Sequence, residues 1–163
     1  MSNGDILVHR TSPFSDVGAK KCSVAASATL IYPGEPVVRA LAAGVVTKMA
    51  TNKPVVATDY VYGIATTTST NNVSTAGEVW VQRIMPGTIY KIKPKVAATF
   101  DTQAEYDALV GDRVLLDLSA TTGDYTILAA DNATYGCVIE WIDVARNPGY
   151  VAFSFRNGCS DLS

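Results

Sequence analysis

The sequence predicts an all-β protein: a single-domain β-barrel or sandwich of many short, mostly antiparallel strands with one short α-helix. Two observations support this. Valine, threonine and alanine dominate the 163 residues, and glycine or proline interrupts the chain at short intervals. The β-branched and aromatic runs between these interruptions are typical of sandwiches and barrels. We expect one β domain over residues 18–163, preceded by an N-terminal arm over residues 1–17 that orders when a partner binds.

Short alternating runs bounded by turn residues define the expected strands. In chain order they are residues 6–10, 22–31, 36–42, 45–49, 61–65, 77–84, 88–95, 113–118, 125–129, 135–144 and 149–156. In the last strand Val151, Phe153 and Phe155 share one face, and the residues between them point the other way. One side of this strand should therefore pack against the core.

A hairpin is expected over residues 77–93. Pro86 and Gly87 separate its two strands, and this pair supplies the fixed φ and then the positive φ of a type II turn. Pro94 has no N–H to donate, so we expect this end of the second strand at a sheet edge or at the strand terminus.

The second strand of this hairpin carries a row of lysines. Tyr90 and Ile92 share one of its faces, and Lys91, Lys93 and Lys95 line the other. Charged edge strands resist edge-to-edge aggregation, and this is the favoured interpretation. Docking on an acidic protein surface is the functional alternative.

One helix is expected, over about residues 102–110. Thr102 and Glu105 have the spacing of a capping box, and Gly111 is a C-terminal stop signal. A helix this short is marginal alone, so its apolar side must pack on the sheet as a lid between two strands.

The residues of the segment 66–75 are small, polar and uncharged, apart from one apolar valine. A mobile surface loop is the favoured interpretation of such a composition. The alternative is a contact loop that becomes ordered against a partner.

Charge and composition exclude several classes of protein. A net charge of −2 and a pI near 5.3 provide no basic field for nucleic acid or anionic membranes. No apolar stretch is long enough for a membrane helix and the start lacks a signal-peptide pattern, so we expect a soluble protein. Charged residues make up 17% of the chain, against about 25% in typical domains. This low charge suggests that neighbours cover part of the surface.

Catalytic and metal-binding patterns are absent from the sequence. His9 is the single histidine, and we interpret it as a solvated or strand-edge residue rather than a catalytic base. The cysteines Cys22, Cys137 and Cys159 are odd in number and lack CxxC spacing, so free thiols are expected. We therefore expect no enzyme activity, no cofactor and no metal.

A pair of carboxylates could still catalyse glycoside hydrolysis, which needs only two Asp or Glu side chains that face each other. Glu140 shares a face with apolar neighbours in its expected strand, so a salt bridge to an arginine such as Arg113 or Arg146 is favoured over a catalytic role. The carboxylates considered are Glu78, Asp112, Asp117, Glu140 and Asp143.

Three short segments resemble one known family. They read YPGEPVV at 32–38, YGIA at 62–65, and AGEVWV at 76–81 followed by PGT at 86–88. Over roughly residues 30–95 their order is similar to that of the small all-β head-decoration, or cement, proteins of tailed bacteriophages. In that family a G-x-P-V-V strand opens the domain, a G-I-A strand marks its middle and a G-E-x-x-V strand follows.

The resemblance implies a structural virion protein. Its expected partners are the major capsid protein and further copies of itself in a homotrimer, with no nucleic acid and no membrane. The expected location is the capsid exterior, after synthesis in the host cytoplasm. The candidate capsid-contact residues are Ile6, Val8, His9, Arg10, Lys91, Lys93 and Lys95, and the loop 66–75 is a further candidate.

Two other functions stay open. One is a carbohydrate- or receptor-binding β module of a phage tail or fibre, with Trp80, Tyr60 and Tyr62 as a sugar-stacking platform. The other is a small hydrolase that uses Glu140 or Asp143.

Overall fold

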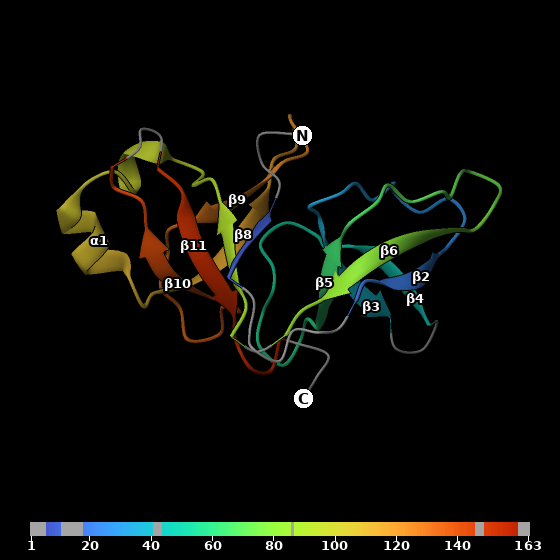
Figure 1. Cartoon of the computed structure of the whole chain (residues 1–163), viewed down its shortest axis with the longest axis horizontal. Coiled ribbons are helices and arrows are strands. Elements are labelled where there is room, and N and C mark those ends of the chain that lie inside the picture. The colour runs from blue at the N-terminus through green and yellow to red at the C-terminus, as the bar shows by residue number, and fades with distance from the viewer. Residues whose placement is uncertain (1–5, 11–17, 41–43, 86, 146–148, 160–163) are drawn as a thin grey trace.

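Two β units lie side by side in the chain (Figure 1). The computed structural model describes residues 6–10, 18–40, 44–85, 87–145 and 149–159, with residues 7–10 and 40 described by their backbone. A closed five-stranded barrel forms one unit, and a six-stranded sheet with a short helix forms the other. The expectation of a mostly β protein with one short helix is confirmed.

The barrel has the strand order β2-β4-β3-β5-β6. It closes because β2 pairs with β6 in antiparallel fashion and with β4 in parallel. Its own small core is made of the buried side chains Val24, Ile31, Val37, Val46, Tyr62, Ala65, Val79 and Val81. The strands are β2 (Lys20–Val24), β3 (Pro36–Ala40), β4 (Val45–Lys48), β5 (Val61–Ala65) and β6 (Gly77–Arg83).

The second unit has the order β1-β7-β11-β10-β8-β9. This sheet curls on itself, because the Ile127 N–H donates to the Lys93 carbonyl at 3.1 Å and the Lys95 N–H donates to the Ile127 carbonyl at 2.9 Å. Strand β9 thus lies against the chain that leaves β7. The strands are β1 (Leu7–Arg10), β7 (Ile89–Ile92), β8 (Arg113–Leu118), β9 (Tyr125–Leu128), β10 (Cys137–Ile142) and β11 (Val151–Phe155).

Each predicted strand has a counterpart in the structure, usually with shorter ends. In β11 the expected inward side chains are buried, with Val151 and Phe153 at 0% exposure and Phe155 at 9%. Tyr90 and Ile92 of β7 are likewise buried. The alternation of apolar residues therefore identified the core-facing side of both strands.

The predicted hairpin over residues 77–93 is wrong. The turn itself exists, since the Thr88 N–H donates to the Met85 carbonyl at 3.1 Å and Gly87 has a φ of +78°. Its two strands nevertheless join different units: β6 pairs with β2 and β5, whereas β7 pairs with β1 and β11. Both edges of β6 are filled when the barrel closes, so the turn leads the chain from the barrel into the sheet.

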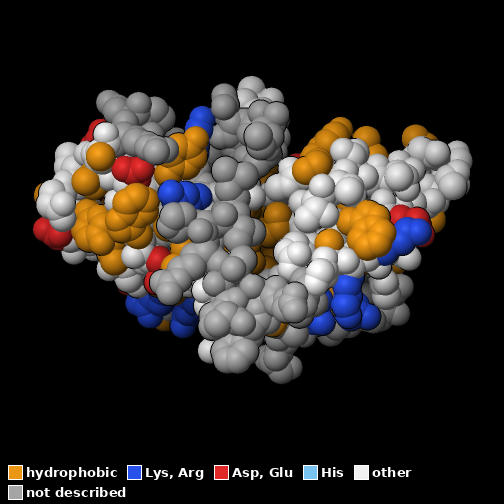
Figure 2. Space-filling model, viewed as in Figure 1, with side chains coloured by type: hydrophobic (Ala, Val, Ile, Leu, Met, Phe, Trp, Pro, Cys, Tyr) orange, Lys and Arg blue, Asp and Glu red, His pale blue; other side chains and the backbone are white. Residues whose placement is uncertain are grey.

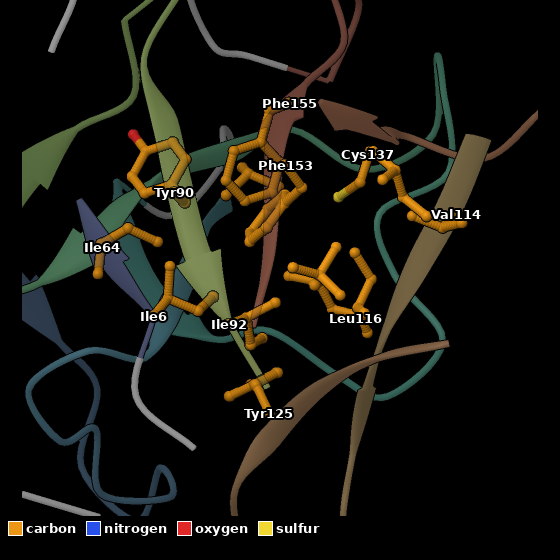
Figure 3. Close-up of a cluster of buried hydrophobic side chains, with 14 of the residues drawn as sticks. Ile6, Ile64, Tyr90, Ile92, Val114, Leu116, Tyr125, Cys137, Phe153 and Phe155 are labelled. Atoms are coloured by element: carbon orange, nitrogen blue, oxygen red, sulfur yellow. The ribbon is translucent and has the colours of Figure 1, made fainter. Parts of the chain in front are cut away.

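A shared hydrophobic core joins the two units. Val61, Ile64 and Ile84 of the barrel side belong to the same buried cluster as Tyr90 and Phe153 of the sheet. Figure 3 shows Ile6 and Ile64 beside Tyr90. Tyr90, Phe153 and Phe155 also form an aromatic trio with ring centroids 5.3–5.7 Å apart, a separation at which ring pairs attract each other.

A buried ion pair reinforces this junction. The Lys48 ammonium lies 2.5 Å from Glu35 Oε1, and the two side chains are only 14% and 9% exposed. The other oxygen of Glu35 accepts the Tyr32 N–H at 2.8 Å. Lys48 also lies 5.6 Å from the ring centroid of Tyr125 in β9, whose hydroxyl donates to the Met49 carbonyl. The pair therefore connects β4 of the barrel to β9 of the sheet.

The predicted helix is confirmed as α1 (Gln103–Leu109). The capping box is present: the Glu105 N–H donates to Thr102 Oγ1 at 3.3 Å, and the Glu105 carboxylate accepts the Thr102 N–H at 2.9 Å. Gly111 ends the helix with a φ of +97°, and its N–H donates to the Ile139 carbonyl of β10. The apolar side of the helix packs against the large core, as expected for a helix that is too short to be stable alone.

We expect Thr102→Ala to lower the free energy of unfolding by about 1 kcal/mol, because it removes the N-terminal cap of α1. Urea unfolding followed by circular dichroism measures the change. Thr102→Ser keeps the hydroxyl and is the matched control. Equal stability of the alanine and serine variants would show that the cap contributes nothing.

Candidate interaction surface

The predicted contact residues of the N-terminal segment are paired within the chain. Ile6 is 3% exposed and belongs to the large core, and its N–H donates to the Gly34 carbonyl at 3.2 Å. Val8 pairs with Tyr90 and Arg10 with Ile89, and the register shifts at His9 between them. In this structure Ile6 helps to fix the segment on β7 and offers no contact surface of its own.

The three predicted lysines do not form one cationic row. Lys91 lies 5.3 Å from the ring centroid of Trp141, and the exposed Lys95 forms an ion pair with Asp117 at 2.8 Å. Strand β7 ends at Ile92, so Pro94 follows the strand terminus, which was one of the two expected positions. The chain beyond the strand turns Lys95 towards β8.

The interpretation of these lysines as edge protection is wrong. Strand β7 lies between β1 and β11 and has neighbours on both sides. Sequence alternation shows which side chains share a face, but it does not show whether another strand will pair with either edge. Here the N-terminal strand β1 covers the edge that the lysines were expected to protect.

The loop 66–75 is held by an extensive network of hydrogen bonds, so the favoured expectation of a mobile loop is wrong. Ser69 and Asn71 are 5% and 4% exposed. The Ser69 N–H donates to the Ile31 carbonyl at 2.8 Å, and the Asn71 amide donates to the Ala28 carbonyl at 2.7 Å. These bonds fasten the loop to the segment that follows β2, beside the barrel core.

The tip of this loop presents an apolar side chain on a fixed backbone. The Asn72 side-chain oxygen accepts the N–H groups of both Ser74 and Thr75 at 2.9 Å. Ser27 Oγ donates to the Val73 carbonyl at 2.6 Å, and the Val73 side chain is 82% exposed. The sequence singled out the segment but not Val73, although it is the one large apolar residue in a polar run.

Other large apolar side chains are exposed on both units. Trp80 on β6 and Trp141 on β10 are 46% and 36% exposed, and Tyr32 is 50% exposed. On the face that Figure 2 shows, hydrophobic side chains occur in separate groups rather than in one continuous patch. On this face the exposed apolar surface is thus divided between small areas.

The expected aromatic platform for sugars does not form. Tyr62 is 8% exposed and packs in the barrel core. The guanidinium groups of Arg39 and Arg83 lie 5.7 and 5.1 Å from its ring centroid. Val61 and Gly63 beside it are buried as well, so β5 is covered on both faces and Tyr62 cannot join Trp80 at the surface.

Two of the predicted carboxylate candidates form ion pairs with different lysines. Glu78 pairs with Lys21 at 2.6 Å, and Asp117 pairs with Lys95. Lys95 and the Thr51 hydroxyl hold the pKa of the Asp117 carboxyl below its ordinary value, because both stabilise its ionised form. Asp112 is half-buried and Asp143 is buried at 8% exposure.

The expectation that Glu140 faces the apolar residues of its strand and pairs with an arginine is wrong. Cys137 and Ile139 of β10 face the core, so Glu140 lies on the opposite side of the strand with the half-buried Val138, where it is exposed and accepts the Ser154 hydroxyl at 2.5 Å. A β-bulge between Ile139 and Trp141 then returns Ile142 to the core side. The extra residue of a bulge reverses the alternation beyond it. Arg113 is instead paired with Asp131, and Arg146 lies outside the described residues.

The three cysteines are free thiols in the structure. Burial raises the pKa of Cys159 to about 11 and raises the pKa values of Cys22 and Cys137 as well. A thiol needs to ionise to act as a nucleophile or metal ligand. The raised pKa values favour the protonated thiols and so work against both roles.

No group of three or more His, Cys, Asp or Glu side chains is placed to hold a metal ion within the part of the chain that the structure describes. The helices described here are too short to cross a membrane. No protein-family model, curated protein or solved structure matches the chain.

Proposed function

We propose that the chain is a structural protein of a bacteriophage virion that binds the outer surface of the capsid and stabilises the lattice of the major capsid protein. The observation that carries this proposal is the preordered loop 66–75 with Val73 at its tip. An interface centre is formed by apolar side chains that desolvate on contact, and a loop that is already rigid loses little entropy on binding.

Composition and sequence segments support the same role. The chain has only 17% charged residues, and its exposed apolar side chains lie on strands and ordered loops of both units. A homotrimer on the capsid exterior would cover part of this surface. Of the segments that resemble decoration proteins, GEVWV at 77–81 lies within β6, and the last three residues of GEPVV at 34–38 begin β3.

The alternative of a carbohydrate- or receptor-binding tail module is less well supported. It depended on a platform of three exposed aromatic side chains, and Tyr62 is buried.

The proposal is tested by co-sedimentation of the purified chain with expanded empty capsids of the phage that encodes it. We expect saturable binding, and Val73→Asp should reduce the affinity about tenfold or more, because it places a charge in the centre of the contact. Val96→Asp is the matched control, since Val96 is 55% exposed on the other unit.

Each outcome of this experiment has a definite meaning. If the unaltered chain does not bind, the capsid function is wrong. If it binds and both valine variants bind equally well, the loop is not the contact. Sedimentation equilibrium of the free protein tests the trimer separately, and a monomer at high concentration would contradict it.

A further inference from the structure

An open pocket of about 570 Å³, with both polar and apolar walls, lies beside the β8–β9 hairpin. Its walls are formed by Asp117 and Leu118 at the end of β8, by the turn that follows, by Thr51 and Asn52, and by Lys95 beyond β7. Small-molecule sites are typically about 300–1,000 Å³ in volume. The pocket is therefore large enough for a small ligand, and none of the predicted functions uses it.

Part of the pocket lining is fixed by a network of charges and hydrogen bonds. Asp117 is only 13% exposed, with one carboxylate oxygen on the Lys95 ammonium at 2.8 Å and the other accepting the Thr51 hydroxyl at 2.7 Å. Thr51 Oγ1 also accepts the Leu118 N–H at 3.0 Å. These contacts hold the polar groups in place before any ligand arrives.

Other lining residues of the pocket have unused hydrogen-bonding groups. Among the described residues, neither the Asn52 amide nor the Asp124 carboxylate has a hydrogen bond from its side chain, although both line the pocket. The Thr122 hydroxyl accepts only the Asp124 N–H, at 3.4 Å, and it can still donate. The lining thus offers both hydrogen-bond donors and acceptors.

We propose that this pocket binds a neutral carbohydrate. A sugar hydroxyl both donates and accepts, so it matches a wall that offers an amide, hydroxyls, an ammonium and carboxylates together. Hydrogen bonds to carboxylate and ammonium groups, such as those of Asp124 and Lys95, are charge-assisted and stronger than neutral ones. Asp124 and Asp117 repel anions, and Lys95 on Asp117 opposes a divalent cation.

The test uses amide chemical shifts of the isotopically labelled full chain, titrated separately with glucose, galactose and N-acetylglucosamine. We expect at least one of these sugars to produce saturable shifts confined to the amides around the pocket. Inorganic phosphate and calcium chloride at matched ionic strength should leave these amides unchanged.

Two variants locate the binding. Ala120→Phe fills the pocket from an exposed turn position and should weaken sugar binding about tenfold or more. Ala133→Phe makes the same change at an exposed turn away from the pocket lining and should have no effect. Asp124→Ala, which removes acceptors without filling space, should also weaken binding.

Three results would overturn the proposal: no response to any of the sugars, shifts scattered over the surface, or equal binding by the Ala120→Phe and Ala133→Phe variants. A response of the same amides to phosphate or calcium but not to sugars would assign the pocket to an ion instead. Because capsid binding is measured independently, failure here leaves that function untouched.

Discussion

Lys48→Met is expected to destabilise the protein by about 3–5 kcal/mol, since it leaves the Glu35 carboxylate buried without a counter-charge. The pair lies at the junction of the two units, with side-chain exposures of 14% and 9%. Removing the ammonium also removes its contact with the ring of Tyr125 on β9. The loss should appear in urea unfolding as a lower midpoint with an unchanged slope.

The exposed pair between Lys21 and Glu78 provides a control on the same barrel. Its side chains are 52% and 54% exposed, so Lys21→Met should cost less than about 1 kcal/mol. The double variant Glu35→Gln with Lys48→Met should lose less stability than the sum of its single variants, because no charge is left unpaired. Equal effects of Lys48→Met and Lys21→Met would show that burial of the Glu35 pair is unimportant.

Local features of the fold were predictable from the sequence. The capping box of Thr102 and Glu105 needs only residues three apart, and it forms as expected. Strands β5 and β8 have the predicted bounds, because apolar runs between turn residues define them without reference to a partner. The core-facing residues of β11 follow in the same way from alternation.

Features that depend on distant parts of the chain were not predictable. The turn at Gly87 has the expected geometry, yet its two strands separate into different units because β2 and β5 occupy both edges of β6. In β10 the core side is that of Cys137 and Ile139, and a bulge after Ile139 brings Ile142 to the same side, so Glu140 does not share a buried face with Ile142. The sequence CVIEWI contains no signal for a bulge, so alternation alone could not show which side chains beyond it face the core.

For the candidate surface, too, local features could be predicted and features that depend on distant residues could not. The sequence identified the loop 66–75 as a possible contact from its composition, but composition alone could not distinguish a mobile loop from a rigid one. The difference lies in the buried hydrogen bonds of Ser69 and Asn71 to backbone groups about 40 positions earlier. Likewise, the burial of Tyr62 depends on Val24 and Val79 of other barrel strands.

Rigidity of this loop depends on a close approach at Gly77, where β6 begins. A Cβ atom at position 77 would lie 2.0 Å from the Asn71 backbone nitrogen and 2.5 Å from the Asn71 Cα. Backbone atoms cannot move aside as a flexible side chain would, so Gly77→Ala must displace the loop. The displacement would break the buried contacts of Ser69 and Asn71, which are costly to leave unpaired.

We therefore expect Gly77→Ala to lower the free energy of unfolding by about 3 kcal/mol, from the clash together with the lost buried hydrogen bonds. Gly18→Ala is the matched control, because nothing lies within 4 Å of its added Cβ. The urea-unfolding midpoint measures both effects, and hydrogen exchange at the Asn71 amide reports whether the loop has detached. If Gly77→Ala unfolds at the midpoint of Gly18→Ala, the loop can shift at no cost, and the argument that it presents Val73 on a rigid support fails with it.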